Sequence, residues 1–278
     1  MIVSSMRSMR NGKKQDLTPI LFLVFVVCII MLPRLVEAGA QSTTITILYN
    51  NVPGRTDCIT DWGFACLVKG KEKTVLFDTG QNGSILLHNM KCMNVDPGSI
   101  DVIVLSHIHS DHAGGLAEFL KHRNNVVVYV PAFFPLHFKR AAKTEGATVE
   151  EVSNARQLCN DVSTTGEMGF GIREQALIVE TSKGMAIITG CAHPGIVNIV
   201  KTAQEQHNDN VYMVIGGFHL SSMSSGEIEH IISRLRELGV RKVAPSHCTG
   251  AQALDLFRDT WGKNFIEGGV GAIIELPY

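Results

Sequence analysis

The stretch SHIHSDHAGG, residues 106–115, places three imidazoles and one carboxylate within six positions. They belong to His107, His109, Asp111 and His112. The apolar run DVIVL before this stretch predicts a buried strand, and AGGLAEFLKHR, which overlaps its end, predicts a helix. In α/β folds, sites gather in such connections, beyond the carboxyl ends of strands. We therefore expect a functional site here rather than a solvated polar loop.

The spacing within this cluster favours a metal centre. His107 and His109 lie two positions apart on extended chain, so both can face one point. Asp111 and His112 follow where the chain turns, so they face a second point nearby. Imidazole nitrogen combined with carboxylate oxygen suits Zn²⁺, and Mn²⁺ or Fe²⁺ is also compatible.

Three further histidines stand where an apolar strand gives way to a turn of small residues. They are His193 in AIITGCAHPG, His219 in MVIGGFHL and His247 in VAPSHCTG. A lone histidine in that setting is usually structural, but three of them beside the loop cluster favour a shared site. The other histidines lack the setting, and we expect them at the surface: His88, His122, His137, His207 and His230.

Asp78 also ends an apolar run, in TVLFDTG. Asp-Thr-Gly is good turn chemistry, so a turn role is one interpretation. The functional interpretation is a carboxylate that lies behind a ligand histidine and orients it.

Residues 41–278 alternate short β-branched runs with helical patterns, which predicts one α/β domain. Many strands are apolar throughout, so we expect their sheets to be covered on both faces. ALIVETSKGMAIITG predicts a hairpin that turns at residues 182–184. SSGEIEHIISRLRELG predicts a helix with a capping box of Ser224 and Glu227, and with Gly239 after its end.

The first forty residues differ from the rest. A basic flank precedes the apolar run of residues 20–32, and small residues in an A-x-A pattern follow it. This pattern predicts a signal peptide, or an uncleaved signal anchor over residues 17–33, with the remainder exported. We expect membrane association only through such an uncleaved segment.

The composition restricts the partners. The chain has 278 residues and a formal net charge of −1, which argues against a nucleic-acid binder. A small-molecule substrate is the expected partner. The spacing of the cysteines fixes no disulfide. Cys191 and Cys248 lie close to His193 and His247 in sequence, so they are thiol ligands, a redox pair, or small residues packed beneath the site.

The motifs FDTG, SHIHSDHAGG, TGCAHPGIVNI, IGGFHL and SHCTG, in this order, resemble those of the metallo-β-lactamase superfamily. More narrowly, they resemble the branch of 7,8-dihydropterin-6-methyl-4-(β-D-ribofuranosyl)aminobenzene 5′-phosphate synthase, from about Ile45 to the C-terminus. The resemblance implies a four-layer αββα sandwich with two divalent metal ions, zinc foremost, between its sheets.

The resemblance also implies how the ligands divide. The first ion would take His107, His109 and His193, and the second would take Asp111, His112 and His247. Most members of the superfamily supply a bridging aspartate from the fourth motif, but IGGFHL contains no acid. Solvent alone would then bridge the ions, and His219 would be a ligand, a proton donor or a phosphate contact. We expect His219 to line the site.

The predicted activity is hydrolysis of a phosphorylated or otherwise anionic small molecule by metal-activated water, with Asp111 as ligand and proton shuttle. The first alternative is a transferase of the synthase type, which condenses a pterin. We favour hydrolysis because that pathway is cytoplasmic, whereas the chain carries an export signal. A non-catalytic metal or ligand binder is the second alternative. A redox role on an iron pair is the third, and it usually accompanies a flavin-binding domain.

The region of residues 146–174 shows no clear periodicity, and loops there often cover the pocket in this superfamily. Within it, Arg173 and Glu174 are candidate substrate contacts or a solvated ion pair. Trp62 and Phe64 line the pocket or fill the core.

Overall fold

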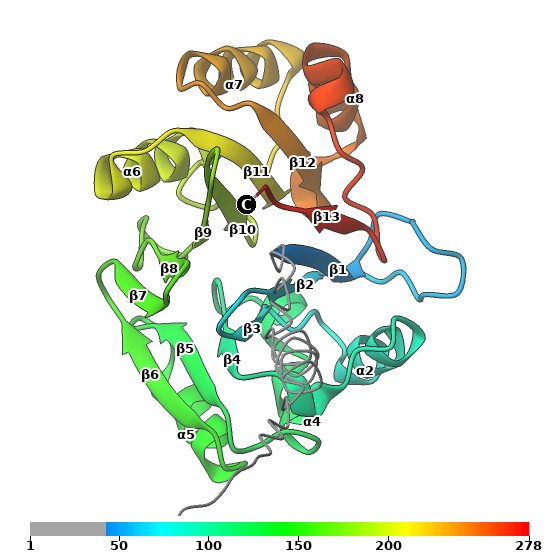
Figure 1. Ribbon diagram of the computed structural model, residues 1–278, viewed down its shortest axis with the longest axis vertical. Coiled ribbons are helices and arrows are strands. Elements are labelled where there is room, and N and C mark those ends of the chain that lie inside the picture. The colour runs from blue at the N-terminus through cyan, green and yellow to red at the C-terminus, as the bar shows by residue number, and fades with distance from the viewer. Residues whose placement is uncertain (1–42, 278) are drawn as a thin grey trace, which may run out of the picture. The chain divides into compact units, whose positions relative to one another are not determined.

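Two β-sheets face each other in this computed structural model, which describes residues 43–277 (Figure 1). The first sheet has seven strands, in the order β13 (Ile273–Glu275), β1 (Thr44–Asn50), β2 (Phe64–Lys69), β3 (Thr74–Phe77), β4 (Val102–Val104), β5 (Val127–Pro131) and β6 (Thr148–Val152). The second has six strands, in the order β12 (Lys242–Ser246), β11 (Val211–Gly217), β10 (Gly184–Thr189), β9 (Leu177–Thr181), β8 (Val162–Thr164) and β7 (Arg156–Cys159).

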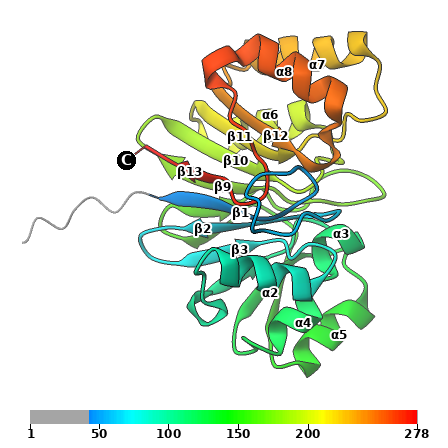
Figure 2. The same ribbon diagram turned by 90° about the vertical axis from the view of Figure 1, so that its right-hand side faces the viewer.

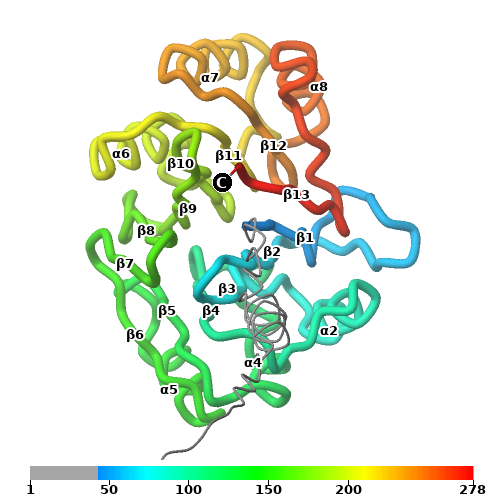
Figure 3. The backbone as a smooth tube through the Cα atoms, viewed as in Figure 1, coloured from blue at the N-terminus to red at the C-terminus, as the bar shows by residue number. Residues whose placement is uncertain are grey.

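Helices cover the outer face of each sheet (Figure 2). The first sheet carries α2 (Gly83–Cys92), α3 (Ser110–Ala113), α4 (Leu116–Leu120) and α5 (Leu136–Thr144). The second carries α6 (Ile196–His207), α7 (Ser225–Glu237) and α8 (Ala251–Trp261). Short 3₁₀ turns lie at η1 (Pro97–Ser99), η2 (His247–Thr249) and η3 (Gly262–Asn264). The described residues belong to one compact unit. Their backbone trace follows the same layers, helices outside two facing sheets, and these layers form the expected αββα sandwich (Figure 3).

Three apolar cores hold the layers together. One lies between the sheets, where Ile47 and Phe77 of the first face Val179 and Ile188 of the second. The second core joins α6, α7 and α8 to their sheet, and the third joins α2, α4 and α5 to the other. Strands such as β10 and β11 are buried along their whole length because they pack on both faces, which confirms the expectation from their apolar runs.

Local signals in the sequence place several boundaries correctly. β9 and β10 pair antiparallel from Thr181 opposite Gly184, as the predicted hairpin requires. Ser224 and Glu227 form the predicted capping box at the start of α7. Gly239 follows the end of α7 with φ of 76°, a backbone conformation that favours glycine.

Two regions differ from the sequence prediction. Residues 146–174 contain β6, β7 and β8, which are short and, in β6 and β7, largely exposed, so they carry no periodic apolar pattern. The single helix expected over residues 113–123 is instead α3 followed by α4. The chain breaks at Gly114 and Gly115, where a Cβ on Gly115 would lie 2.2 Å from the Thr79 carbonyl oxygen. Only glycine allows the loop of residues 106–115 to approach so closely the segment that follows β3.

The predicted membrane segment requires correction. Among residues 43–277, no helix is long and apolar enough to cross a membrane. The transmembrane and signal-peptide predictions rested on residues 1–40, with residues 17–33 as the anchor, and these lie outside the described residues. The apolar run there is also shorter than the roughly 20 residues that a spanning helix needs. The transmembrane and signal-peptide assignments are therefore withdrawn.

Candidate metal centre

The loops after β4, β10, β11 and β12 meet at one place and carry all the predicted site histidines. His107 and His109 follow β4, His193 follows β10, His219 follows β11, and His247 begins η2 after β12. Asp111 and His112 lie on α3. The predicted residues are up to 140 positions apart in the sequence, from His107 to His247, yet their rings form one continuous group. These contacts build two adjacent sets of ligand atoms.

The first set consists of His107, His109 and His193, whose ligand atoms all lie within 4.8 Å of one another. His107 Nε2 lies 3.2 Å from His109 Nδ1. His193 Nε2 is buried and has no hydrogen-bond partner among the described residues. Buried polar atoms are almost always paired, so this nitrogen fits a metal ion as its missing partner.

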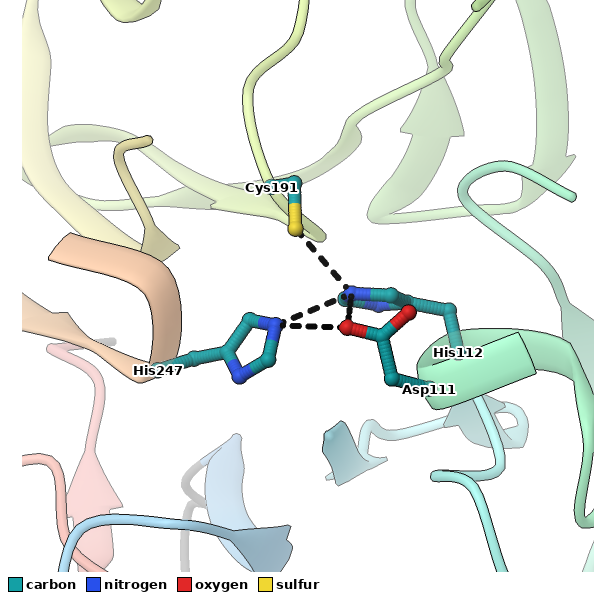
Figure 4. A group of neighbouring side chains, drawn as sticks. All are labelled: Asp111, His112, Cys191 and His247. Atoms are coloured by element: carbon teal, nitrogen blue, oxygen red, sulfur yellow. Dashed lines mark hydrogen bonds and ion pairs between the residues drawn. The ribbon is translucent and has the colours of Figure 1, made fainter. Parts of the chain in front are cut away.

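The second set contains Asp111, His112 and His247, joined by a residue outside the implied ligand set, Cys191 (Figure 4). His112 Nε2 lies 3.2 Å from both His247 Nε2 and Cys191 Sγ. Asp111 Oδ2 lies 3.2 Å from His247 Nε2 and 3.6 Å from His112 Nε2. Oxygen, nitrogen and sulfur ligands converging at these distances fit Zn²⁺.

Asp78 is fully buried behind this centre; it contacts His112 of the second set directly and is linked to His107 of the first set through Ser106. Its Oδ2 accepts hydrogen bonds from His112 Nδ1 at 2.7 Å and from the Ser106 hydroxyl at 2.7 Å. Because that hydroxyl donates to Asp78, it is left to accept from His107 Nδ1, 2.8 Å away. Both imidazoles then carry the proton on Nδ1 and present the Nε2 lone pair to the site.

Asn51 orients the imidazole of His247 in the same way, although its sequence context did not mark it as a site residue. Asn51 Oδ1 lies 2.7 Å from His247 Nδ1, and Asn51 Nδ2 donates to the His247 carbonyl at 3.2 Å. The only sequence signal is its position directly after the apolar strand β1.

Glu174 departs from its predicted surface role. It is 1% exposed. Its carboxylate accepts backbone N–H groups from Gly190, Cys191, Ala192 and His193 at 2.8–3.0 Å. Burial raises the pKa of Glu174 to about 7, against the opposing effect of these N–H groups. Glu174 therefore fixes the loop that carries His193 and Cys191, and the prediction of a solvated pair was wrong.

The electrostatics suit metal binding. Burial lowers the pKa of His107 well below its ordinary value, and it lowers that of His193 to about 4, with help from His219. Both imidazoles are thus neutral at pH 7. Burial opposes ionisation of Asp111, but the hydrogen bond with His247 and the charge of His112 outweigh it and hold the Asp111 pKa well below its usual range.

His219 stands at the edge of the centre. It is exposed, and its ring centroid lies 4.5 Å from that of His193. Its ligand atom groups with the sulfur atoms of Cys191 and Cys248, so it shares only Cys191 with the second set. A hydrogen bond with Cys248 is the main cause that raises the His219 pKa above its ordinary value, against the opposing effect of burial.

Backbone strain is concentrated at the same place. Asp78, Ala192, His219 and His247 adopt positive φ of 59°, 61°, 57° and 53°. Left-handed conformations of residues other than glycine cost free energy and persist where the surroundings fix them, often at functional sites.

The surroundings separate the remaining candidates. Trp62 is 50% exposed, and its ring lies 4.9 Å from that of His247, so it lines the site, whereas Phe64 is in the core. Arg173 forms an ion pair with Glu167 and lies over the ring of Phe133.

The histidines assigned to the surface lie away from the centre. Four are exposed, as expected: His88, His122, His137 and His230. His207 is instead partly buried, beside Ser163 and Glu180.

A family model described as the metallo-beta-lactamase superfamily matches residues 63–200. A curated relative from Methanocaldococcus jannaschii is 32% identical, over 74% of this chain and 85% of its own length. That relative is a 7,8-dihydropterin-6-methyl-4-(beta-D-ribofuranosyl)-aminobenzene-5′-phosphate synthase. The chain belongs to the metallo-β-lactamase superfamily. The resemblance inferred from its motifs is thereby confirmed.

Solved structures agree on the fold. Tm1679, a metal-dependent hydrolase of the beta-lactamase superfamily, superposes with a TM-score of 0.72 and 26% identity, over 85% of this chain and all (100%) of its own. YhfI of Bacillus subtilis, a metallo-beta-lactamase fold protein, gives 0.63 at 13% identity, over 84% of this chain and 98% of its own.

Proposed function

We propose that this superfamily member is a metal-dependent hydrolase that binds two divalent ions, zinc foremost, and acts on a phosphorylated or otherwise anionic small molecule. The observation that carries the proposal is the pair of adjacent ligand sets around His107 and His112. Such ions lower the pKa of water and polarise the bond under attack.

The protein residues divide the remaining work. Asp78 and Asn51 hold the ligand imidazoles in the tautomers that binding requires. Asp111 is ionised and partly exposed, so it serves as a ligand and accepts protons. His219 is exposed beside His193 and is placed to donate a proton or to contact an anionic group of the substrate.

The position of Trp62 favours a small organic molecule as the substrate. Its half-exposed ring beside His247 offers an apolar face next to the ligands, as small-molecule sites commonly do. The near-zero net charge of the chain argues against a nucleic-acid substrate, which would need an extended basic surface.

A transferase of the synthase type is the second candidate. The 32% identity to the Methanocaldococcus jannaschii synthase, over 85% of that protein, favours it. The argument against it is the predicted export of the chain, which stays a prediction. Both candidates need an anionic substrate at the same metal centre.

The test uses the full chain purified without chelator. Metal is counted by elemental analysis while phosphomonoesters, phosphodiesters, lactones, thioesters and β-lactams are assayed for hydrolysis. A parallel assay mixes the phosphorylated pterin with the ribofuranosylaminobenzene phosphate and follows condensation. His230→Ala, on the exposed face of α7, is the matched control for His109→Ala and His247→Ala.

We expect about two ions per chain and hydrolysis that both site variants lose and the control keeps. Condensation without hydrolysis would establish the transferase instead. A chain that binds metal but turns over neither class of substrate would refute both activities.

A further inference from the structure

Cys191 lies at the centre of the second ligand set, although the motifs assign it no role. It is 3% exposed, and its sulfur is 3.2 Å from His112 Nε2. Its sulfur also lies within 4.8 Å of the ligand atoms of Asp111 and His247. Figure 4 shows the four side chains pointing toward one another from three separate segments.

The distances between these ligand atoms are close to those of a coordination tetrahedron. Around Zn²⁺, with Zn–N of about 2.0–2.1 Å and Zn–S of about 2.3 Å, neighbouring ligand atoms are roughly 3.3–3.6 Å apart. Of the six distances that join the ligand atoms of His112, His247, Asp111 and Cys191, four are 3.2, 3.2, 3.2 and 3.6 Å. The other two, from Cys191 to Asp111 and to His247, are within 4.8 Å. Ligand atoms that lie this close together can therefore be brought onto one ion by small adjustments of their side chains.

Hydrogen bonds and close packing fix the loop that carries Cys191. Glu174 holds the N–H groups of residues 190–193, which places Cys191 toward one ligand set and His193 toward the other. Gly217 lets the neighbouring strand approach closely, because a Cβ there would lie 3.2 Å from the Cys191 Cα. The thiol therefore needs no rearrangement to reach the second set.

With Cys191 included, the two sets differ in the number of ligands and in their total charge. Three imidazoles form the first set. Because an imidazole that binds a metal adds no charge, an ion there would keep its full charge and one position of a tetrahedron for a ligand from outside the protein. The second set would combine the carboxylate of Asp111 and the thiolate of Cys191 with two imidazoles. Such a set neutralises a divalent ion and completes its tetrahedron.

We propose that Cys191 is a thiolate ligand that closes the second metal site, in place of the bridging acid that IGGFHL lacks, so that substrate engages the first site. The inference rests on the metal-binding part of the proposed function and on neither activity. Without an ion, the hydrogen bond with Cys248, followed by burial, holds the Cys191 pKa above its ordinary value. A coordinated thiol is deprotonated outright, so binding of the second ion releases a proton.

The experiment loads the full chain with Co²⁺ and records the thiolate-to-cobalt charge-transfer absorption together with cobalt per chain. Cys191→Ser removes the proposed ligand, and Cys191→Asp restores a charged oxygen ligand. Cys248→Ser removes the neighbouring thiol, which lies outside the second set. Cys66→Ser is the control for a buried thiol in the core between the sheets.

We expect the charge-transfer band in the wild type, Cys248→Ser and Cys66→Ser. It should be absent in Cys191→Ser, together with about one ion per chain, and Cys191→Asp should regain the ion but not the band. The band should persist in His109→Ala, which weakens only the first site. A band that survives Cys191→Ser, or that disappears in Cys248→Ser, would overturn the proposal. Hydrolysis that fails while the band behaves as expected would refute the activity and leave Cys191 as a ligand.

Discussion

Replacing Asp78 by Asn should weaken metal binding without disturbing the backbone. Asp78 has φ of 59°, a left-handed conformation that Asn tolerates as well as Asp. The amide can keep only one of the two carboxylate oxygens. If its NH₂ takes the Oδ2 position, it faces the Nδ1 of His112 at about the observed 2.7 Å. His112 must then move its proton to Nε2, which removes the lone pair from the second ligand set.

The magnitude follows from these contacts. Loss of a hydrogen-bonded partner behind a ligand histidine costs about 10–100-fold in metal affinity, which is roughly 1.4–2.8 kcal/mol. The affinity for the second ion should fall more than that for the first, because Asp78 contacts His112 directly and reaches His107 only through Ser106. The metal-free protein should also lose about 1.5–3 kcal/mol of unfolding free energy, since a buried charged acceptor disappears.

The assay is competition for Zn²⁺ with a chromophoric chelator at pH 7.5, which resolves two dissociation constants. Asp101→Asn is the matched control. Like Asp78, which accepts the Ser106 backbone N–H, Asp101 accepts a backbone N–H, from Thr74 at 2.8 Å, but it is exposed just before β4. Wild-type affinity for the second ion in Asp78→Asn, or an equal loss in Asp101→Asn, would refute the tautomer argument.

Three further predictions concern the same centre. Ser106→Ala should reduce the affinity for the first ion more than that for the second in the same titration, because His107 is the ligand that loses its hydrogen bond with Ser106. The reverse order would contradict this. Glu174→Gln should reduce the unfolding free energy of the metal-free chain by about 1–3 kcal/mol in urea, because the amide NH₂ faces backbone N–H groups, and an unchanged midpoint would refute the role of Glu174. On acidification, the second ion should dissociate at a higher pH than the first. Burial opposes protonation of His112, but Asp78 outweighs it and raises the His112 pKa, whereas the pKa of His193 is lowered to about 4, so protons compete for the second set first. Cobalt spectra recorded from pH 7.5 to 4.5 check the order, and simultaneous release would count against it.

Local sequence patterns predicted many of the structural elements and site residues of this protein. The spacing in SHIHSDHAGG, and histidines at the ends of apolar runs, predicted which residues the structure brings together, because strand ends and turns are properties of a short window. The same is true of the capping box at Ser224 and of the hairpin before Gly184. The irregular residues 146–174 gave no such signal, because edge strands that are partly exposed need not alternate.

What surrounds the ligands was decided only by the tertiary structure. Glu174 resembles a surface acid in sequence, yet it is buried because its partners are the N–H groups of a loop 16–19 residues away. Asn51 meets His247 across 196 residues, and Cys191 meets His112 across 79. Backbone N–H groups and long-range partners leave no mark in a local sequence window. The chain alone therefore indicated a metal centre, whereas packing of the two sheets decided which atoms orient its ligands and brought the Cys191 sulfur among them.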